Sequence, residues 1–293
     1  MHTTQTFLAP AKINLFLHIV GVREDGYHLL QTVFQLLDFY DRIHFKVTED
    51  GAIKRRNEVA GVPEETDLCI RAAKLLKAHT QTNLGVEISV EKNIPMGGGL
   101  GGGSSDAAAV LLALNRLWNL NLDRQTLMQL GLQLGADVPF FIFGQNAWGE
   151  GVGEQLSSIA LKENFYVILN PNVHVSTAQI FANKQLTKNT IPKRMSDFSS
   201  TVNSAAGSEH SNVMLGFINQ LEKCVCDDYP KVSACLNWLK QFGDARMTGS
   251  GASVFLEVQT EKDARAILQQ VPSGMQGFVA KGLNRHPLYE FTD

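Results

Sequence analysis

The stretch that most constrains the fold is residues 95–105, PMGGGLGGGSS, in which six of the eleven residues are glycine. Glycine reaches positive φ at little cost, so successive backbone N–H groups can turn toward one point and form an anion-binding nest. A half-buried strand is predicted just before it, at residues 86–91, and a helix just after it, with Ser104 or Ser105 as N-cap. A glycine loop between a strand and a helix N-terminus is typical of a phosphate-binding cradle.

Three other interpretations of this loop are weaker. Gly97, Gly99 and Gly102 match the dinucleotide fingerprint, but that fold needs a second strand after the helix, and residues 121–134 instead predict another helix. A P-loop is excluded because no Gly-Lys-Ser/Thr ends the run. A flexible linker would join segments without periodicity, and both neighbours of this loop are strongly periodic.

Composition limits the class of protein. A chain of 293 residues, 44% hydrophobic and 19% charged, is typical of a soluble globular protein and long enough for two domains. The net charge of −3 gives no reason to expect a nucleic-acid or membrane surface. The cysteines lack metal-type spacing and fit reduced thiols, and the first residues do not resemble a secretion signal. The cysteines and the N-terminus thus favour a cytoplasmic protein. We also expect a monomer or weak homodimer whose partner is a small molecule.

Two polar positions stand out beside the loop. Residues 12–20 alternate, with Lys12 and Asn14 on one face, which is either the solvated side of a surface strand or a functional pair. Asp137 precedes Val138 and Pro139, a pattern typical of the N-cap of a short helix. The nearby anion-binding loop favours a functional interpretation of both positions.

The order of predicted elements indicates an α+β fold. Strands and helices are intermixed in two halves, with a boundary near residues 150–160. A helix is expected from Thr66 or Asp67 to Lys77. Residues 183–212 are rich in Ser, Thr, Asn and Lys, which predicts a long mobile connection or lid.

Five motifs carry a resemblance to a known family. They are AKINLF at 11–16, DGYH at 25–28, PMGGGLGGGSS at 95–105, GADVP at 135–139 and TGSGA at 248–252. Together they resemble the galactokinase, homoserine kinase, mevalonate kinase and phosphomevalonate kinase superfamily, and within it the 4-diphosphocytidyl-2-C-methyl-D-erythritol kinase family.

The resemblance implies a two-domain α+β small-molecule kinase. Residues 1–155 would form a ribosomal-protein-S5-like domain with the glycine loop and the catalytic pair, and residues 156–293 a ferredoxin-like domain. ATP with Mg²⁺ would be the co-substrate, with no tightly bound cofactor. The acceptor would be the 2-hydroxyl of 4-(cytidine 5'-diphospho)-2-C-methyl-D-erythritol, in the non-mevalonate route to isoprenoid precursors.

The resemblance also implies the site residues. Lys12 and Asp137 would be the catalytic pair; Tyr27 and Phe181 would sandwich the cytosine, and His28 would bond its edge. Asn14 and Thr177 match substrate-contacting positions. ATP would bind to Pro95, Met96, Gly97, Gly98, Gly99, Leu100, Gly101, Gly102, Gly103, Ser104 and Ser105. The nearest candidate magnesium ligands are Ser104, Ser105 and Asp106.

Two alternatives stay open on the sequence. Another small-molecule kinase of the same superfamily would have no evident use for the Tyr27-His28 pair, since that pair needs a base to bind. A non-catalytic nucleotide-binding module would not need Lys12 and Asp137 together.

Overall fold

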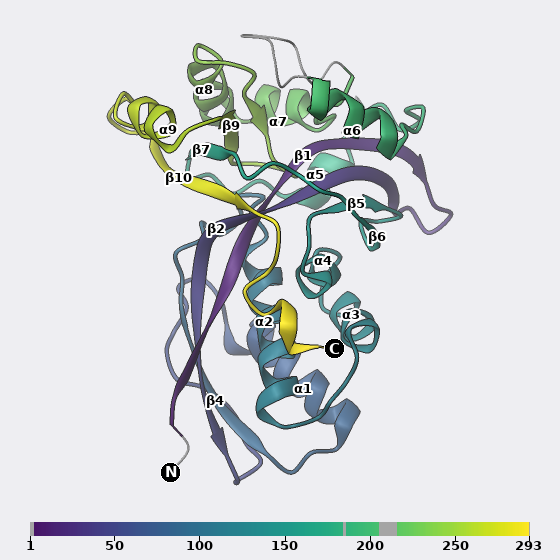
Figure 1. The fold of residues 1–293 in the computed structure, drawn as a ribbon, viewed down its shortest axis with the longest axis vertical. Coiled ribbons are helices and arrows are strands. Elements are labelled where there is room, and N and C mark those ends of the chain that lie inside the picture. The colour runs from purple at the N-terminus through teal and green to yellow at the C-terminus, as the bar shows by residue number, and fades with distance from the viewer. Residues whose placement is uncertain (1–2, 184–185, 205–215, 293) are drawn as a thin grey trace.

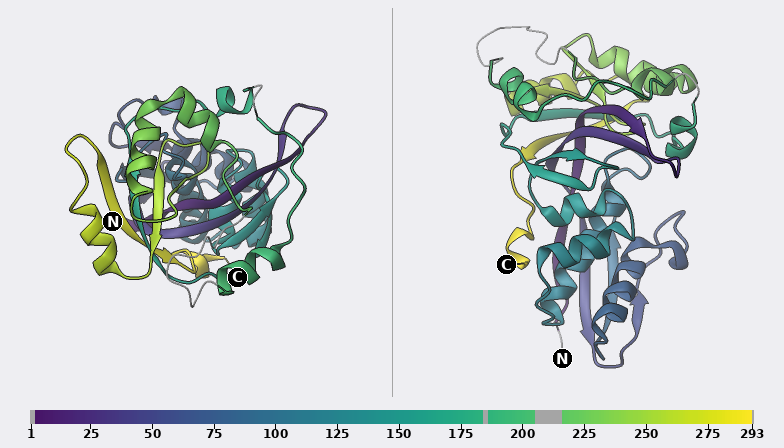
Figure 2. Two further views of the ribbon diagram at one scale, coloured as in Figure 1. Left: turned by 90° about the horizontal axis from the view of Figure 1, so that it is seen from above. Right: turned by 90° about the vertical axis from the view of Figure 1, so that its right-hand side faces the viewer.

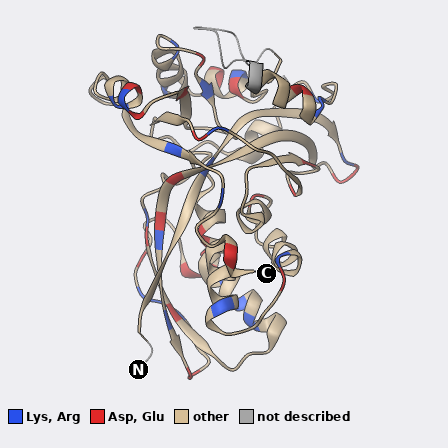
Figure 3. Cartoon of the chain, in the orientation of Figure 1, with Lys and Arg blue, Asp and Glu red and all other residues tan. Residues whose placement is uncertain are grey.

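The computed structural model describes residues 3–183, 186–204 and 216–292. Two lobes are stacked along the long axis of the molecule (Figures 1 and 2). The long strands β1 (Gln5–Val22) and β2 (His28–Thr48) pair antiparallel and run from one lobe into the other. Basic and acidic residues are interspersed over both lobes (Figure 3).

The second edge of β2 is shared by three strands in turn. β5 (Ala147–Glu150) pairs with residues 32–34 of β2, β10 (Gln276–Leu283) with 36–37, and β4 (Gly85–Glu91) with 42–48, all antiparallel. The sheet continues through β7 (Phe165–Asn170), β9 (Val254–Val258) and β8 (Arg246–Met247) in the C-terminal lobe. The short strands β3 (Ile53–Arg55) and β6 (Gln155–Ser158) flank β4 and β5. One sheet therefore joins both lobes.

Helices cover this sheet separately in each lobe. Those of the N-terminal lobe are α1 (Leu68–Thr80), α2 (Gly102–Leu117), α3 (Arg124–Leu132) and α4 (Val138–Phe143). Those of the C-terminal lobe are α5 (Thr177–Phe181), α6 (Met195–Ser204), α7 (Glu222–Asp228), α8 (Pro230–Leu239) and α9 (Glu261–Leu268). Short 3-10 helices lie at Glu64–Thr66 and Tyr289–Phe291. The predicted α+β class is confirmed. Among the residues described, none of the helices combines the length and apolar character needed to cross a bilayer.

The helix after the glycine loop begins earlier than predicted. α2 begins at Gly102, and its N-cap is Gly101, whose φ of 73° is left-handed. The hydroxyl of Ser105 donates to the carbonyl of Pro10 at 2.6 Å. The prediction of Ser104 or Ser105 as N-cap is therefore wrong, since Ser105 lies within the first helical turn and its hydroxyl ties the helix to β1. Of the two residues predicted to start the helix that ends near Lys77, Asp67 is the N-cap of α1. Its side chain accepts the N–H of Cys69.

Side chains of β1 change faces partway along the strand. The register with β2 is irregular between Asn14 and Leu17, and such a bulge redirects the side chains that follow it. Leu17 consequently lines the same cavity as Lys12 and Asn14, although strict alternation places it on the opposite face. Lys12 and Asn14 are each 3% exposed, so the interpretation as a solvated surface strand is also wrong.

The segment predicted to be a mobile connection or lid contains a docked helix. Phe198 of α6 is fully buried and packs its ring on Phe16, Trp148 and Phe217. Residues 195–204 are thus helical where a connection was expected, because one aromatic side chain anchors an otherwise polar helix. The mobility of the segment and its role as a lid stay predictions. Residues 184–185 and 205–212 of this segment lie outside the described part of the chain.

Each lobe's core contains residues from the other half of the sequence. Leu17 and Ile19 of β1 pack into the core of the C-terminal lobe, and Leu288 packs into that of the N-terminal lobe. The boundary between residues 155 and 156 stays a prediction.

His286 is buried where the chain end meets the N-terminal lobe, and its backbone N–H donates to the carbonyl of Gly144 at 2.9 Å. The N–H of Leu288 donates to His286 Nδ1 at 3.0 Å, so that nitrogen carries no proton. Burial, followed by the charge of Arg124, lowers the pKa of His286 from 6.5 to about 3. The folded state therefore keeps this ring neutral at pH values where the unfolded chain binds a proton.

We expect His286→Asn to flatten the pH dependence of stability. Because the folded pKa is depressed, the contribution of His286 is fully present above pH 6.5 and is lost as the pH falls toward 3. The free energy of unfolding of the wild type should fall on the order of 2 kcal/mol more than that of the variant between pH 7 and pH 5. Urea unfolding of both proteins at the two pH values measures this. Parallel losses would contradict it.

Candidate active site

Two cavities meet beside the glycine loop. The larger has a volume of about 800 Å³ and extends along β1, and the smaller, of about 550 Å³, lies over the glycine loop. Gly99, Ser104, Thr177 and Ser250 line both cavities. Two ligands bound side by side would therefore meet at these residues.

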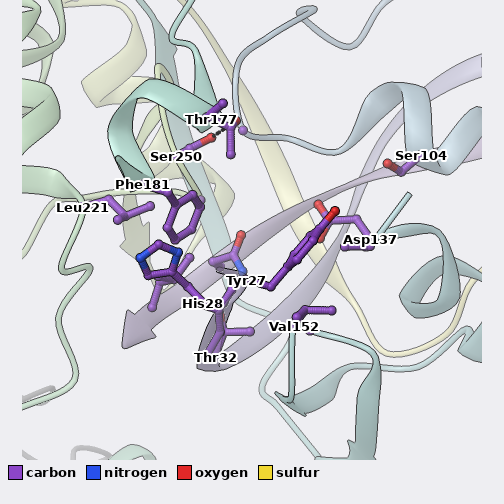
Figure 4. Close-up of a pocket in the computed structure, with 18 of the residues that line it drawn as sticks. Tyr27, His28, Thr32, Ser104, Asp137, Val152, Thr177, Phe181, Leu221 and Ser250 are labelled. Carbon is purple, nitrogen blue, oxygen red and sulfur yellow. Dashed lines mark hydrogen bonds between the residues drawn. The ribbon is translucent and has the colours of Figure 1, made fainter. Parts of the chain in front are cut away.

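The structure brings the predicted catalytic pair together at the larger cavity. Lys12 Nζ donates to Asn14 Oδ1 at 2.6 Å and lies 3.2 Å from Asp137 Oδ2. The Lys12 side chain is 4% exposed and that of Asp137 34%. Asp137 occupies the N-cap position of α4 but its side chain makes no cap bond. The carboxylate instead pairs with Lys12 and lines the cavity, as Figure 4 shows.

A chain of hydrogen bonds fixes the orientation of Asn14. The hydroxyl of Thr32 donates to the carbonyl of Phe16 at 2.5 Å, so its oxygen accepts from Asn14 Nδ2 at 2.9 Å. The amide oxygen of Asn14 must then face Lys12. The N–H of Asn14 donates to Thr248 Oγ1 at 2.8 Å. Asn14 thus orients the lysine as well as lining the cavity.

The glycine loop approaches β1 through its backbone. Gly97, Gly99 and Gly101 have φ values of 67°, 74° and 73°, which favour glycine. The N–H of Lys12 donates to the carbonyl of Leu100 at 3.0 Å. A Cβ on Gly101 would lie 3.0 Å from Lys12 Cγ, so the loop can touch the lysine only without a side chain there.

Most of the residues predicted to bind ATP line the smaller cavity. The exceptions are Leu100 and Ser105, which do not border it. Leu100 is buried in the core between the lobes, and the Ser105 hydroxyl is already bonded to Pro10. Their role in ATP binding stays a prediction.

The second glycine turn, residues 246–254, forms the opposite wall. The N–H of Ser253 donates to the carbonyl of Gly98 at 3.0 Å. The hydroxyls of Thr177 and Ser250 lie 2.8 Å apart where the two cavities join. Sequence reasoning did not assign Ser250 to the site, although the TGSGA motif that contains it was part of the resemblance.

A buried ion cluster below the loop is absent from the sequence-based prediction. Lys92 bonds Asp41 and, at 2.6 Å, Asp106. Asp41 also accepts the N–H of Ile94 at 2.8 Å, just before the loop. Burial raises the pKa of Asp106 to about 7. The nearby charge of Lys92 lowers this pKa, and that of Asp41 raises it. Lys92 also lines the smaller cavity. The cluster therefore joins β2, the start of the loop and α2.

Aromatic residues line the other end of the larger cavity. The rings of His28 and Phe181 lie 5.0 Å apart, inclined by 37° (Figure 4). Tyr27 lines the same cavity and is 64% exposed. Burial, followed by the charge of Lys188, lowers the pKa of His28. The structure thus gathers Tyr27, His28 and Phe181 at one cavity, although they come from different halves of the sequence.

Comparison with known proteins agrees with this geometry. The family model "GHMP kinases N terminal domain" matches residues 67–145, and "GHMP kinases C terminal" matches residues 201–277. A crystal structure of mevalonate kinase, 17% identical, shares the fold with a TM-score of 0.69 over 96% of this chain and 100% of that one. The chain is a small-molecule kinase of the GHMP class.

Closer relatives narrow the class. The 4-diphosphocytidyl-2-C-methyl-D-erythritol kinase of Nitrosospira multiformis is 56% identical, covering 97% of this chain and 93% of its own. That of Thiobacillus denitrificans is 54% identical, covering 99% of both. A crystal structure of 4-(cytidine 5'-diphospho)-2C-methyl-D-erythritol kinase, 31% identical, has a TM-score of 0.82 over 95% of this chain and 99% of that one. The chain belongs to the 4-diphosphocytidyl-2-C-methyl-D-erythritol kinase family.

We expect Gly103→Ala to weaken ATP binding without harming the fold. Gly103 is in the first turn of α2 and lines the smaller cavity, and its new Cβ would lie 3.4 Å from Leu68 Cδ1, an ordinary contact. The methyl group should stabilise the helix but hinder phosphate approach, raising the KM for ATP about tenfold. Initial rates with each substrate varied, and urea unfolding, measure these effects. Equal rises in KM for ATP and acceptor would contradict the assignment.

Proposed function

We propose that the chain transfers the γ-phosphoryl group of ATP to the 2-hydroxyl of 4-(cytidine 5'-diphospho)-2-C-methyl-D-erythritol. The observation that carries the proposal is the union of two cavities beside a buried lysine and its carboxylate partner. Phosphoryl transfer needs a nucleotide and an acceptor alcohol in line, with charge stabilised at the point of transfer. The four residues that border both cavities supply that meeting point.

ATP would occupy the smaller cavity. Its phosphates would lie against the backbone N–H groups of residues 97–103 and the N-terminus of α2, where partial positive charge collects. Glycines at these positions let phosphate oxygens approach the backbone closely. The γ-phosphate would then lie next to Ser104, at the border with the larger cavity.

Asp137 and Lys12 would act at the reacting end of the acceptor. A tertiary alcohol is a hindered and weakly acidic nucleophile, so its orientation matters strongly. Asp137 would accept the hydroxyl proton as the new O–P bond forms and the bond from the γ-phosphorus to the β–γ bridging oxygen breaks, releasing ADP. The ammonium of Lys12 would stabilise charge on the transferred group. Lys12 is suited to this role because Asn14 and Asp137 hold its ammonium at the cavity wall.

The cytidine would occupy the aromatic end of the larger cavity. Tyr27 and Phe181 would stack on the base and His28 would bond its edge. The lowered pKa of His28 favours the neutral ring, which can donate through one nitrogen and accept through the other. Another kinase of the same superfamily, acting on a smaller alcohol, would leave this end of the cavity unused.

Magnesium would accompany the nucleotide. Mg²⁺ takes one or two protein oxygens and completes its shell with phosphates and water. Ser104 fits best, because it borders both cavities, and in the described part of the chain its hydroxyl makes no hydrogen bond. Ser105 fits poorly, since its hydroxyl bonds Pro10. Asp106 pairs with Lys92 through Oδ2, and its buried Oδ1 has no hydrogen-bond partner in the described part of the chain. The ion would neutralise phosphate charge, while the steps above depend on the chain's own residues.

We further propose that this reaction takes place in the cytoplasm and that the chain acts as a monomer or weak homodimer. Four cysteines without disulfides support a reducing compartment.

We expect Asp137→Asn to lower turnover by roughly 10²- to 10⁴-fold with the fold intact. The amide keeps the shape of the carboxylate but cannot accept a proton. Single-turnover rates and the thermal unfolding midpoint of the variant measure the two effects. Near-normal turnover in a folded variant would reduce Asp137 to a residue at a helix start.

We expect Tyr27→Ala and Phe181→Ala each to raise the KM for the cytidine substrate by about tenfold or more, since stacking on a base contributes about 1–3 kcal/mol. The KM for ATP should stay within about twofold, because ATP occupies the other cavity. His28→Ala should instead relax the choice between cytidine- and uridine-linked substrates, since an edge hydrogen bond rejects the wrong base. Kinetics with both substrates test this. Equal use of both by the wild type would favour the superfamily alternative.

A further inference from the structure

One lysine of the larger cavity has no role in the function proposed so far. Lys188 lines this cavity from the segment between α5 and α6, and it is solvent-exposed. The chain is anchored on both sides of it. Leu186 is buried in the core of the C-terminal lobe, and the N–H of Thr190 donates to the carbonyl of Ile19 at 3.0 Å. These anchors, two residues away in each direction, hold Lys188 at the cavity.

The other full charges of this cavity are already neutralised. Lys12 pairs with Asp137 at 3.2 Å, and Asp25 pairs with Arg23 at 2.6 Å. Within residues 3–183, 186–204 and 216–292, Lys188 has no ion pair and no hydrogen bond. Lys188 is therefore the unpaired cation with which an anionic ligand in this cavity would form an ion pair.

The proposed acceptor has such an anionic group. A diphosphate joins its cytidine to its tetritol, so a ligand that spans the cavity from the aromatic end to Asp137 carries the diphosphate between them. Removing phosphate oxygens from water is costly unless cationic donors replace the water. The charge of Lys188 already acts on His28, which places the ammonium within electrostatic reach of the aromatic end.

We propose that Lys188 binds the diphosphate bridge of the acceptor and positions its hydroxyl at the catalytic pair. This inference rests on the proposed function and adds a positioning residue to it. Lys12 then stabilises the transferred phosphoryl group, and Lys188 binds the diphosphate bridge, which does not react. Binding energy from the diphosphate would be used to orient the tetritol, and the chemical step would be left to Lys12 and Asp137.

The decisive experiment is a calorimetric titration with cytidine, cytidine monophosphate and cytidine diphosphate. Lys188→Met should bind cytidine diphosphate roughly five- to tenfold more weakly than the wild type, with cytidine affinity within about twofold. Lys188→Arg should restore diphosphate binding. Lys193→Met is the matched control, because Lys193 lies five residues along the same segment and does not line the cavity. It should behave as the wild type.

Kinetics of the same variants separate positioning from chemistry. In Lys188→Met the KM for the acceptor should rise by the same factor and kcat should also fall, because part of the diphosphate binding energy orients the hydroxyl. The KM for ATP should stay within about twofold. Equal loss of cytidine and cytidine diphosphate affinity would place Lys188 at the base and overturn the inference. Unchanged diphosphate affinity, or an equal loss in Lys193→Met, would overturn it too. Failure of the wild type to bind cytidine at all would instead contradict the proposed function.

Discussion

The site depends on a close backbone contact between the glycine loop and its two neighbours. On one side, Leu100 accepts the N–H of Lys12, and on the other, Gly98 accepts the N–H of Ser253. A Cβ on Gly99 would lie 2.5 Å from the carbonyl oxygen of Thr248, so the wall at residues 246–254 can approach only a glycine. The loop that would hold ATP phosphates is thus packed directly against the strand that carries Lys12. Its glycines serve tertiary packing as well as phosphate approach.

The long strand β2 explains why the two cavities meet at the junction of the lobes. It pairs with β1 along one edge, and along the other with β5, β10 and β4 in succession. Because β2 extends through both lobes, its partner β1 does so too. β1 therefore carries Lys12 to the glycine loop and Leu17 into the core of the C-terminal lobe. Residues distant in sequence, such as His28 and Phe181, are then brought to one cavity wall.

Local sequence patterns predicted the features that depend on neighbouring residues alone. The glycine loop, the strand at β4 and the Asp67 cap follow from φ preferences, alternation and capping chemistry. The bulge after Asn14 and the shifted start of α2 did not follow, because contacts with other segments set them. The roles of Lys12 and Asp137 came from family resemblance, and the residues alone suggested only a polar pair. What the structure adds is that the two lie 3.2 Å apart beside the loop.

The ion cluster of Asp41, Lys92 and Asp106 could not be predicted from local sequence patterns either. These residues are separated by 51 and 14 positions, and no periodicity connects them. Nothing in the sequence predicts that the three lie together, since most charged residues are solvated. In the fold Asp41 and Asp106 are buried and Lys92 lies partly buried between them, so removing Lys92 would leave uncompensated buried charge. The cluster therefore fixes the base of the loop through electrostatics that only the assembled fold reveals.

The contacts of Lys12 show how a buried ammonium is tolerated at a cavity wall. An ammonium has three N–H donors, and two of them face Asn14 and Asp137. The ring of Phe34, 5.4 Å from Nζ, covers another side of the charge. Because Thr32 fixes the amide of Asn14, the acceptors around the lysine cannot rearrange freely. In the described part of the chain no third acceptor contacts this ammonium, so its remaining donor would be available to a phosphoryl oxygen in the cavity that Lys12 lines.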